Sequence, residues 1–278
     1  MKQLFDHVSG PCSKLTTRAY SNSFSLGIYC LDKRLHSDVY AVYGFVRFAD
    51  EIVDTFHDYD KEMLLSEFKQ ETWKAIERKI SLNPILNSFQ HVVNKYSIEP
   101  ELITCFFKSM ETDLSCAAHS IDSYEEYILG SAEVVGLMCL RTFTGNNEEL
   151  YQQLKPGAMR LGAAFQKVNF LRDLKVDYQD LGRVYFPGVD LHSFSEKEKK
   201  SIEQDIEDDF HEAYKSIKLL PDTARFGVYV AFVYYKSLFN KIRTLPSAKI
   251  LMERVRISKR KKIRLLLTSY LRHSFSAL

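Results

Sequence analysis

The chain has 278 residues, of which 45% are hydrophobic and 27% are charged, the composition of an ordinary soluble globular protein with a sizeable core. Its 38 basic and 36 acidic side chains leave a formal net charge of +2, so no global field favours nucleic acid as a partner. No stretch approaches the roughly 20 apolar residues that span a bilayer.

The N-terminal residues, MKQLFDHVSGPCSK, lack the uninterrupted apolar core of a signal peptide. The cysteines are scattered and form no CxxC pair, which fits thiols in a reducing cytosol rather than a zinc site or a disulfide framework. They are Cys12, Cys30, Cys105, Cys116 and Cys139. We therefore expect a cytoplasmic protein. A peripheral contact with the inner face of the membrane stays open, as does the oligomeric state.

Apolar residues recur at spacings of three and four through most of the chain, as in residues 62–80 and 226–245, while alternating strand patterns are missing. The segments SIEPEL and SFSEKEKKSI are typical of helix starts. We interpret the prolines as breaks between helices; they are Pro11, Pro84, Pro100, Pro156, Pro187, Pro221 and Pro246. The pattern predicts one all-α domain over residues 1–278, with roughly ten helices.

A first acidic motif, RFADEIVD, occupies residues 47–54. On a helix that turns about 100° per residue, its charged side chains share one sector of roughly 100°; they are Arg47, Asp50, Glu51 and Asp54. Apolar residues cover the other faces, where a surface helix would be polar. We therefore expect this helix to be buried among others, with its charged stripe facing an internal space.

A second motif, FQKVNFLRDLKVD, repeats this geometry about 120 residues later. Its polar face carries Gln166, Asn169, Asp173 and Asp177. Two such helices facing each other would place four carboxylates around one cavity. Like charges in a low-dielectric site repel and raise each other's pKa, so a cation should lie between them.

Oxygen ligands without His or Cys select Mg²⁺ or a similar ion such as Mn²⁺, and Mg²⁺ usually completes its shell with water and phosphate oxygens. Arg47 and Arg172 stand beside the two motifs and can pair with the same anion. The pattern therefore predicts a phosphate or diphosphate as ligand.

Two other interpretations compete with this one. A single DxxxD on a helix is usually a solvated face, and a non-catalytic helical scaffold could bind a partner's basic face through both acidic stripes. That scaffold requires both stripes on the surface and no metal dependence. A di-iron carboxylate bundle uses Glu-x-x-His pairs, but none of the eight His residues has a Glu three positions before it.

The chain resembles the squalene and phytoene synthases, and among them most closely the bacterial phytoene synthases. The similarity follows the same order along nearly the whole chain, through YSNSFSLG, YGFVRFADEIVD, YILGSAEVVGLM, FQKVNFLRDLKVDYQDLGRVYFP and RVRISKRKK. It implies an all-α isoprenoid synthase fold, with helices around a central cavity and Mg²⁺ as cofactor.

The resemblance also implies roles for individual residues. Metal ions that clamp the substrate diphosphates would be held by Asp50, Asp54, Asn169, Asp173 and Asp177, and catalysis would depend on the four aspartates together with Arg47. Phosphate oxygens would be contacted by Ser21, Ser23, Arg47, Arg172, Tyr235, Arg254 and Lys259. Tyr127 and Gln166 would line the cavity. An aromatic at helical spacing, such as Tyr235, fits a core residue equally well.

Three positions depart from the family pattern. Glu51 stands where the first motif usually has a second Asp, which keeps the charge and lengthens the reach. Val176 replaces an acid before the last Asp of the second motif, at an angle off the metal-facing stripe. Glu133 follows Ala132 where Gly is usual, and a buried carboxylate there would need a partner.

The resemblance implies a head-to-head condensation of two geranylgeranyl diphosphates to phytoene, through a cyclopropyl diphosphate intermediate, in carotenoid biosynthesis. A dehydrosqualene or squalene synthase acting on farnesyl diphosphate shares the motifs, and cavity depth decides between them. Squalene formation would add a reduction by NADPH, for which no glycine-rich fingerprint is present. A terpene cyclase or a prenyl diphosphate hydrolase would use the same clamp on one substrate, without doubling its carbon count.

The C-terminal stretch ERVRISKRKKIRLLLTSYLRHSF joins a basic cluster to leucines and an isoleucine at 263–271. Such a segment could lie on an anionic membrane surface. Alternatively, the leucines pack on the core, and the basic side chains are solvated or contact the diphosphate.

Overall fold

The computed structural model describes residues 2–115, 120–179, 185–189 and 194–274, without the side chains of Asn22, residues 176–179 and Ser274. Within these ranges the chain forms α-helices and one π-helical turn and contains no strand, which confirms the all-α prediction. No helix in the described ranges is long and apolar enough to cross a bilayer.

The described residues form more helical segments than the ten expected. In chain order they are α1 (Lys2–Tyr20), α2 (Asn22–Tyr29), α3 (Lys33–Asp54), α4 (Lys61–Arg78), α5 (Pro84–Tyr96), α6 (Pro100–Ser115), α7 (Ile121–Ile128), the π-helix η1 (Leu129–Glu133), α8 (Val134–Thr144), α9 (Glu148–Gln179), α10 (Glu196–Ile217), α11 (Asp222–Arg243), α12 (Ser247–Ile250) and α13 (Lys259–Ser274).

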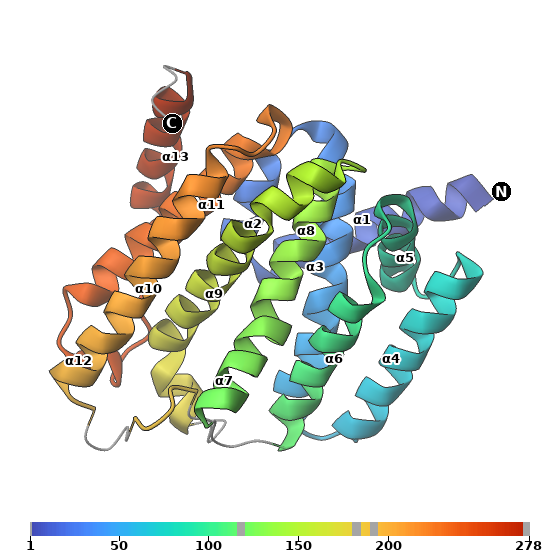
Figure 1. The fold of residues 1–278 in the computed structure, drawn as a ribbon. Coiled ribbons are helices and arrows are strands. Elements are labelled where there is room, and N and C mark those ends of the chain that lie inside the picture. The colour runs from blue at the N-terminus through green and yellow to red at the C-terminus, as the bar shows by residue number, and fades with distance from the viewer. Residues whose placement is uncertain (1, 116–119, 180–184, 190–193, 275–278) are drawn as a thin grey trace.

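The two helices that carry the acidic motifs, α3 and α9, lie in the middle of the molecule (Figure 1). Helix α8 packs against both of them. Helices α4, α5 and α6 cover α3 on one side, while α10 and α11 cover α9 on the other. This arrangement places both motifs inside the bundle.

Side-chain caps set several of the helix starts. Ser195 accepts a hydrogen bond from the backbone N–H of Glu198, whose side chain accepts one from the backbone of Ser195, so α10 begins with a capping box, as SFSEKEKKSI predicts. Pro84 and Pro100 occupy the first positions of α5 and α6, where the missing N–H costs little.

The prediction that every proline breaks a helix was wrong at two positions. Pro11 lies inside α1 and Pro156 lies inside α9. A proline inside a helix removes one backbone hydrogen bond and costs about 3 kcal/mol. Because α9 is packed between α8 and α10 along much of its length, tertiary contacts offset this cost, and the helix continues through Pro156.

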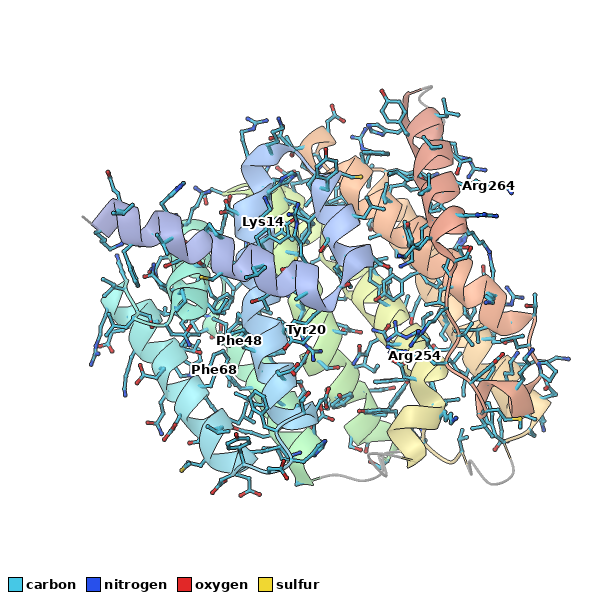
Figure 2. The ribbon with its side chains drawn as sticks, turned by 180° about the vertical axis from the view of Figure 1, so that it is seen from behind. Lys14, Tyr20, Phe48, Phe68, Arg254 and Arg264 are labelled. Carbon is cyan, nitrogen blue, oxygen red and sulfur yellow. The ribbon has the colours of Figure 1, made fainter. Side chains whose placement is uncertain are left out.

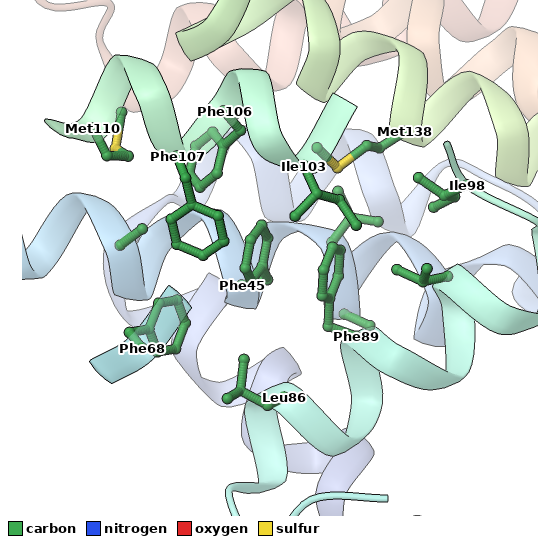
Figure 3. Packing of buried hydrophobic residues seen from close by; sticks show 14 of the residues in the cluster. Phe45, Phe68, Leu86, Phe89, Ile98, Ile103, Phe106, Phe107, Met110 and Met138 are labelled. Carbon is green, nitrogen blue, oxygen red and sulfur yellow. The ribbon is translucent and has the colours of Figure 1, made fainter. Parts of the chain in front are cut away.

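Helix α3 is buried, as the sequence predicted. Val42, Phe45 and Ala49 have no exposed surface. The ring of Phe45 stacks on Phe89 of α5 with centroids 3.8 Å apart and meets Phe107 of α6 edge-on, as Figure 3 shows. A fully buried Phe contributes about 1.5–3 kcal/mol, so this aromatic cluster anchors the helix that carries the first motif.

Helix α9 presents different chemistry on its two sides. Val168 and Leu171 are fully buried. Lys167 faces α10, where its ammonium pairs with Asp205 at 2.6 Å and Asp209 at 2.7 Å. The remaining face carries Gln166, Asn169 and Asp173, which are partly exposed. The second motif therefore lies on the side of α9 that faces away from α10.

Candidate active site

The first acidic motif lies in the last two turns of α3. Arg47 forms an ion pair with Glu51, and its guanidinium lies 4.3 Å from the ring centroid of Tyr20. Among the described atoms, Nε of Arg47 is buried without a hydrogen-bond acceptor. Glu51, one of the three departures from the family pattern, thus neutralises the arginine that the resemblance assigns to phosphate.

The carboxyl of Asp50 is partly buried, and its environment opposes ionisation. Burial raises its pKa to about 7, with further upward contributions from Asp54 and Asp113, while Arg47 acts in the opposite direction. Glu51 adds a smaller upward contribution, so four carboxylates lie close enough to influence one another. A bound cation would relieve their repulsion.

Asp113 of α6 is a candidate site residue that could not be singled out from the sequence. It is 9% exposed, and its Oδ2 accepts a hydrogen bond of 2.8 Å from the hydroxyl of Tyr127. A signal was present, because Asp113 follows Phe106 and Met110 at helical spacing, on the apolar face of α6. The structure thus connects Tyr127 with the first motif through Asp113.

The second motif brings Asp173 into contact with two arginines. Nε of Arg172 lies 3.0 Å and Nε of Arg254 2.7 Å from its Oδ1, and Figure 2 shows Arg254 beside α9. Asn169 Nδ2 donates to Gln166 at 3.5 Å, while Asn169 Oδ1 is buried without a partner among the described atoms. The side chain of Asp177 lies outside the described part of the structure.

Tyr235 of α11 reaches the second motif. Its ring stacks on Phe165 with centroids 3.9 Å apart. Burial raises the pKa of its hydroxyl, and the charge of Arg172 and hydrogen bonds from Asn169 and Arg172 oppose this rise. The hydroxyl therefore lies at the polar face of α9, even though the ring packs in the core.

Aromatic residues connect the two motifs. Burial raises the pKa of Tyr43 on α3 to about 12; a hydrogen bond from Ser21 and the charge of Arg47 oppose the rise, whereas Asp50 and Tyr235 add to it. The ring of Phe24 lies 5.5 Å from Tyr43 and 6.2 Å from Tyr235. Tyr43 therefore faces both the first motif and the tyrosine that contacts the second.

The C-terminal basic patch reaches this region through Lys262. Its ammonium donates to the hydroxyl of Ser23 at 2.9 Å, and burial, together with the charge of Arg172, lowers its pKa. Lys259, the first residue of α13, is exposed. The sequence indicated the basic patch, but it did not indicate which lysine of α13 faces the site.

Glu133, the unexpected mid-chain carboxylate, has basic neighbours on α9. It is partly buried, and burial raises its pKa to about 7, while the charges of Arg160 and Lys167 oppose the rise and Asp209 adds to it. This cluster lies on the α10 side of α9, with Arg160 and Asp209 3.0 Å apart. Arg160 and Lys167 are therefore the basic partners of Glu133, which could not be identified from the sequence.

The donor atoms of the two motifs suit a divalent cation by type, although those that the structure describes are not gathered at one point. No three His, Cys, Asp or Glu side chains of the described residues come close enough together to hold a metal ion. The available donors are nevertheless carboxylate and amide oxygens, which Mg²⁺ prefers. The unpartnered Oδ1 of Asn169 and Nε of Arg47 also fit a site that binds a cation and an anion together.

Comparison with known proteins gives one family. The model of that family, described as squalene/phytoene synthase, matches residues 17–261. A 4,4'-diapophytoene synthase from Staphylococcus haemolyticus is 24% identical over 87% of this chain and 90% of its own length. A phytoene synthase from Arthrospira platensis is 22% identical over 83% and 82%. The crystal structure of a dehydrosqualene synthase in complex with a ligand matches with a TM-score of 0.82 at 23% identity, over 96% of this chain and 98% of the other.

Proposed function

The chain belongs to the squalene/phytoene synthase family, and on that premise we propose that it is a phytoene synthase. It would join two geranylgeranyl diphosphates head to head, through a cyclopropyl diphosphate, in carotenoid biosynthesis. The observation that carries this proposal is the meeting of two carboxylate-bearing helix faces around Tyr43 and Tyr235. The partial burial of Asp50 and Asp173 favours an enzyme over a scaffold with two surface stripes.

Asp50 and Asp54 on α3, with Asn169, Asp173 and Asp177 on α9, would hold Mg²⁺ or Mn²⁺. When bound, the metal supplies positive charge that neutralises the leaving diphosphate. The protein's own part is to hold the carboxylates of the first motif close together, with Arg47 opposing the rise in the pKa of Asp50, and to offer the unpartnered amide oxygen of Asn169.

The basic residues of the site would bind the diphosphate. Arg172 and Arg254 both pair with Asp173. A cation at Asp173 would compete with these two guanidinium groups and leave them available to phosphate oxygens, for which Arg geometry is well suited. Lys262 and the hydroxyl of Ser23 lie near Arg172 and would extend the same anion-binding surface.

The apolar parts of the site would protect a carbocation from water. Phe24, Phe165 and Tyr235 form a contacting aromatic set beside the polar faces, and ring faces attract a cation. The hydroxyl proton of Tyr127 stays on its oxygen, because burial and Asp113 hold the pKa of Tyr127 well above its usual range. Tyr127 would therefore act as a neutral hydrogen-bond donor.

One alternative substrate is favoured by a specific observation. The relatives described above include a 4,4'-diapophytoene synthase and a dehydrosqualene synthase structure, so farnesyl diphosphate is the second candidate. The same residues would then serve a condensation of two C15 units to dehydrosqualene or squalene.

The test is to incubate the purified protein with geranylgeranyl diphosphate or farnesyl diphosphate and Mg²⁺, with and without EDTA, and to identify the extracted hydrocarbon by mass. A metal-dependent C40 product supports phytoene synthase. A C30 product from farnesyl diphosphate alone keeps the head-to-head chemistry and changes the substrate. A product that keeps the carbon count of one substrate, or no product, would overturn the proposal.

A further inference from the structure

Helix α13 packs on the protein along one side only. Its main neighbour is α11. On that side, Ser269 is 2% exposed, and the ring of His273 stacks on Phe226 of α11 with centroids 5.0 Å apart. The opposite side of α13 is therefore available to a partner, and in Figure 1 the helix stands at the upper corner of the molecule, beyond most of the bundle.

The available side carries an apolar stripe. Its members are Ile263 (61% exposed), Leu267 (59%) and Leu271 (53%), with Tyr270 (58%) at its edge, where the tyrosine ring meets Phe226 of α11 with centroids 6.0 Å apart. At about 100° per residue they fall within one sector of roughly 100°. Large apolar side chains that share a helix face and remain more than half exposed mark an interaction surface.

Basic side chains flank the α13 stripe. Arg260 and Arg264 are exposed and lie at the same angles of the helix as Leu267 and Leu271. Arg260, Lys261, Arg264 and Leu265 line an open hollow with a volume of ≈ 520 Å³. Residues 254–274 contain no acidic side chain, so α13 and the segment before it contribute only positive charge to this surface.

We propose that the α13 stripe and its basic flank bind the surface of an anionic lipid bilayer. Apolar side chains would enter the headgroup boundary, while Arg260, Lys261 and Arg264 pair with lipid phosphates. A second copy of the chain fits less well, because two basic surfaces repel each other. The proposal concerns binding alone and does not depend on which prenyl diphosphate the protein uses.

The test is flotation of the purified full-length protein with two kinds of vesicle: equal parts phosphatidylglycerol and phosphatidylcholine, and phosphatidylcholine alone. We expect binding to the anionic vesicles that weakens in high salt. Arg260→Gln with Arg264→Gln should lower the partition coefficient about 30-fold, since each basic residue near such a surface contributes about a fivefold factor. Ile263→Ser with Leu267→Ser should lower it at least about tenfold.

The matched control removes two exposed cations from α4, by Lys74→Gln with Arg78→Gln, which changes the net charge equally and should leave the partition coefficient unchanged. Circular dichroism of each variant verifies the fold. Equal loss in the α4 control, or no binding by the parent protein, would overturn the proposal. So would a dimer in sedimentation velocity that Leu267→Ser converts to a monomer, since the stripe would then be a contact between copies.

Discussion

Acidic and basic side chains of the candidate site already form ion pairs with one another in the absence of any ligand. Asp173 contacts Arg172 and Arg254, and Arg47 contacts Glu51. Asp50 is less well compensated, because burial and neighbouring carboxylates raise its pKa to about 7 despite Arg47. Binding a cation and an anion together would redistribute these pairs without leaving a buried charge unpaired.

Two lysines of the basic patch differ in what they contact, and this gives a prediction. Lys262 donates to Ser23 near Arg172, whereas Lys259 is exposed. A charged hydrogen bond contributes about 1.5–3 kcal/mol, so Lys262→Gln should lower kcat/KM by about 10- to 100-fold, and Lys259→Gln by less than about twofold. Steady-state kinetics of both variants test this prediction. A larger loss of kcat/KM in Lys259→Gln than in Lys262→Gln would contradict it and favour the role that the resemblance gives Lys259.

Glu133 gives a prediction for stability against pH. Its pKa in the folded protein is about 7, above the ordinary value of 4.5, so the folded state binds its proton more tightly than the unfolded state. The contribution of Glu133 to stability should therefore fall as pH rises from about 4.5 to about 7 and should change no further above that range. Glu133→Gln removes this destabilising contribution, which solvent screening of the partly exposed carboxyl reduces to about 2 kcal/mol at pH 8 and which is absent at pH 4.

Urea unfolding of wild type and Glu133→Gln at these two pH values is the measurement. Arg160, Lys167, Asp209 and Glu125 are the charges that act on Glu133, and all of them stay in place in the variant. A stability difference that is the same at both pH values would show that Glu133 ionises normally in the folded state.

At the scale of helices, close backbone approaches hold the second motif in place. A Cβ on Gly162 of α9 would lie 2.6 Å from the carbonyl oxygen of Ala132 in η1. The π-helical turn therefore packs directly on the backbone of α9, one turn before Gln166. Because η1 follows α7, the same contact sets the distance between Tyr127 and the polar face of α9.

This contact predicts a strong effect of a single methyl group. Gly162→Ala should destabilise the protein by about 2 kcal/mol, since overpacking against backbone cannot be relieved by a rotamer change. Gly10→Ala in α1 is the control: nothing lies within 4 Å of its Cβ position, and it should be neutral or stabilise by up to about 1 kcal/mol. Denaturant unfolding compares them, and equal effects would contradict the packing argument.

Helices were predictable where periodicity and caps coincide, and less so where packing decides. The capping box at Ser195 fixed the start of α10, and the apolar faces of residues 42–53 indicated a buried α3. The predicted helix break at Pro156 was wrong because the contacts of α9 with α8 and α10 cannot be seen in a local sequence pattern. The π-helical turn at Leu129–Glu133 carried no recognisable signal.

The whole molecule explains which site residues the sequence could name. Asp50, Asn169 and Asp173 were proposed as site residues from helix phase, and their roles stay predictions. Tyr235 was ambiguous because its ring packs in the core while its hydroxyl reaches Asn169. Asp113 and Lys262 were missed because their importance comes from neighbours distant in sequence, Tyr127 and Ser23.

The central claim is that the faces of α3 and α9 act on one ligand. The most direct measurement is a crystal structure with Mn²⁺ and a thio-diphosphate analogue of geranylgeranyl diphosphate that cannot ionise, in which anomalous scattering locates the metal. We predict metal peaks at Asp50 or Asp54 and at Asn169 or Asp173, with the diphosphate between them. Peaks at neither motif, or a diphosphate bound away from both, would contradict the account.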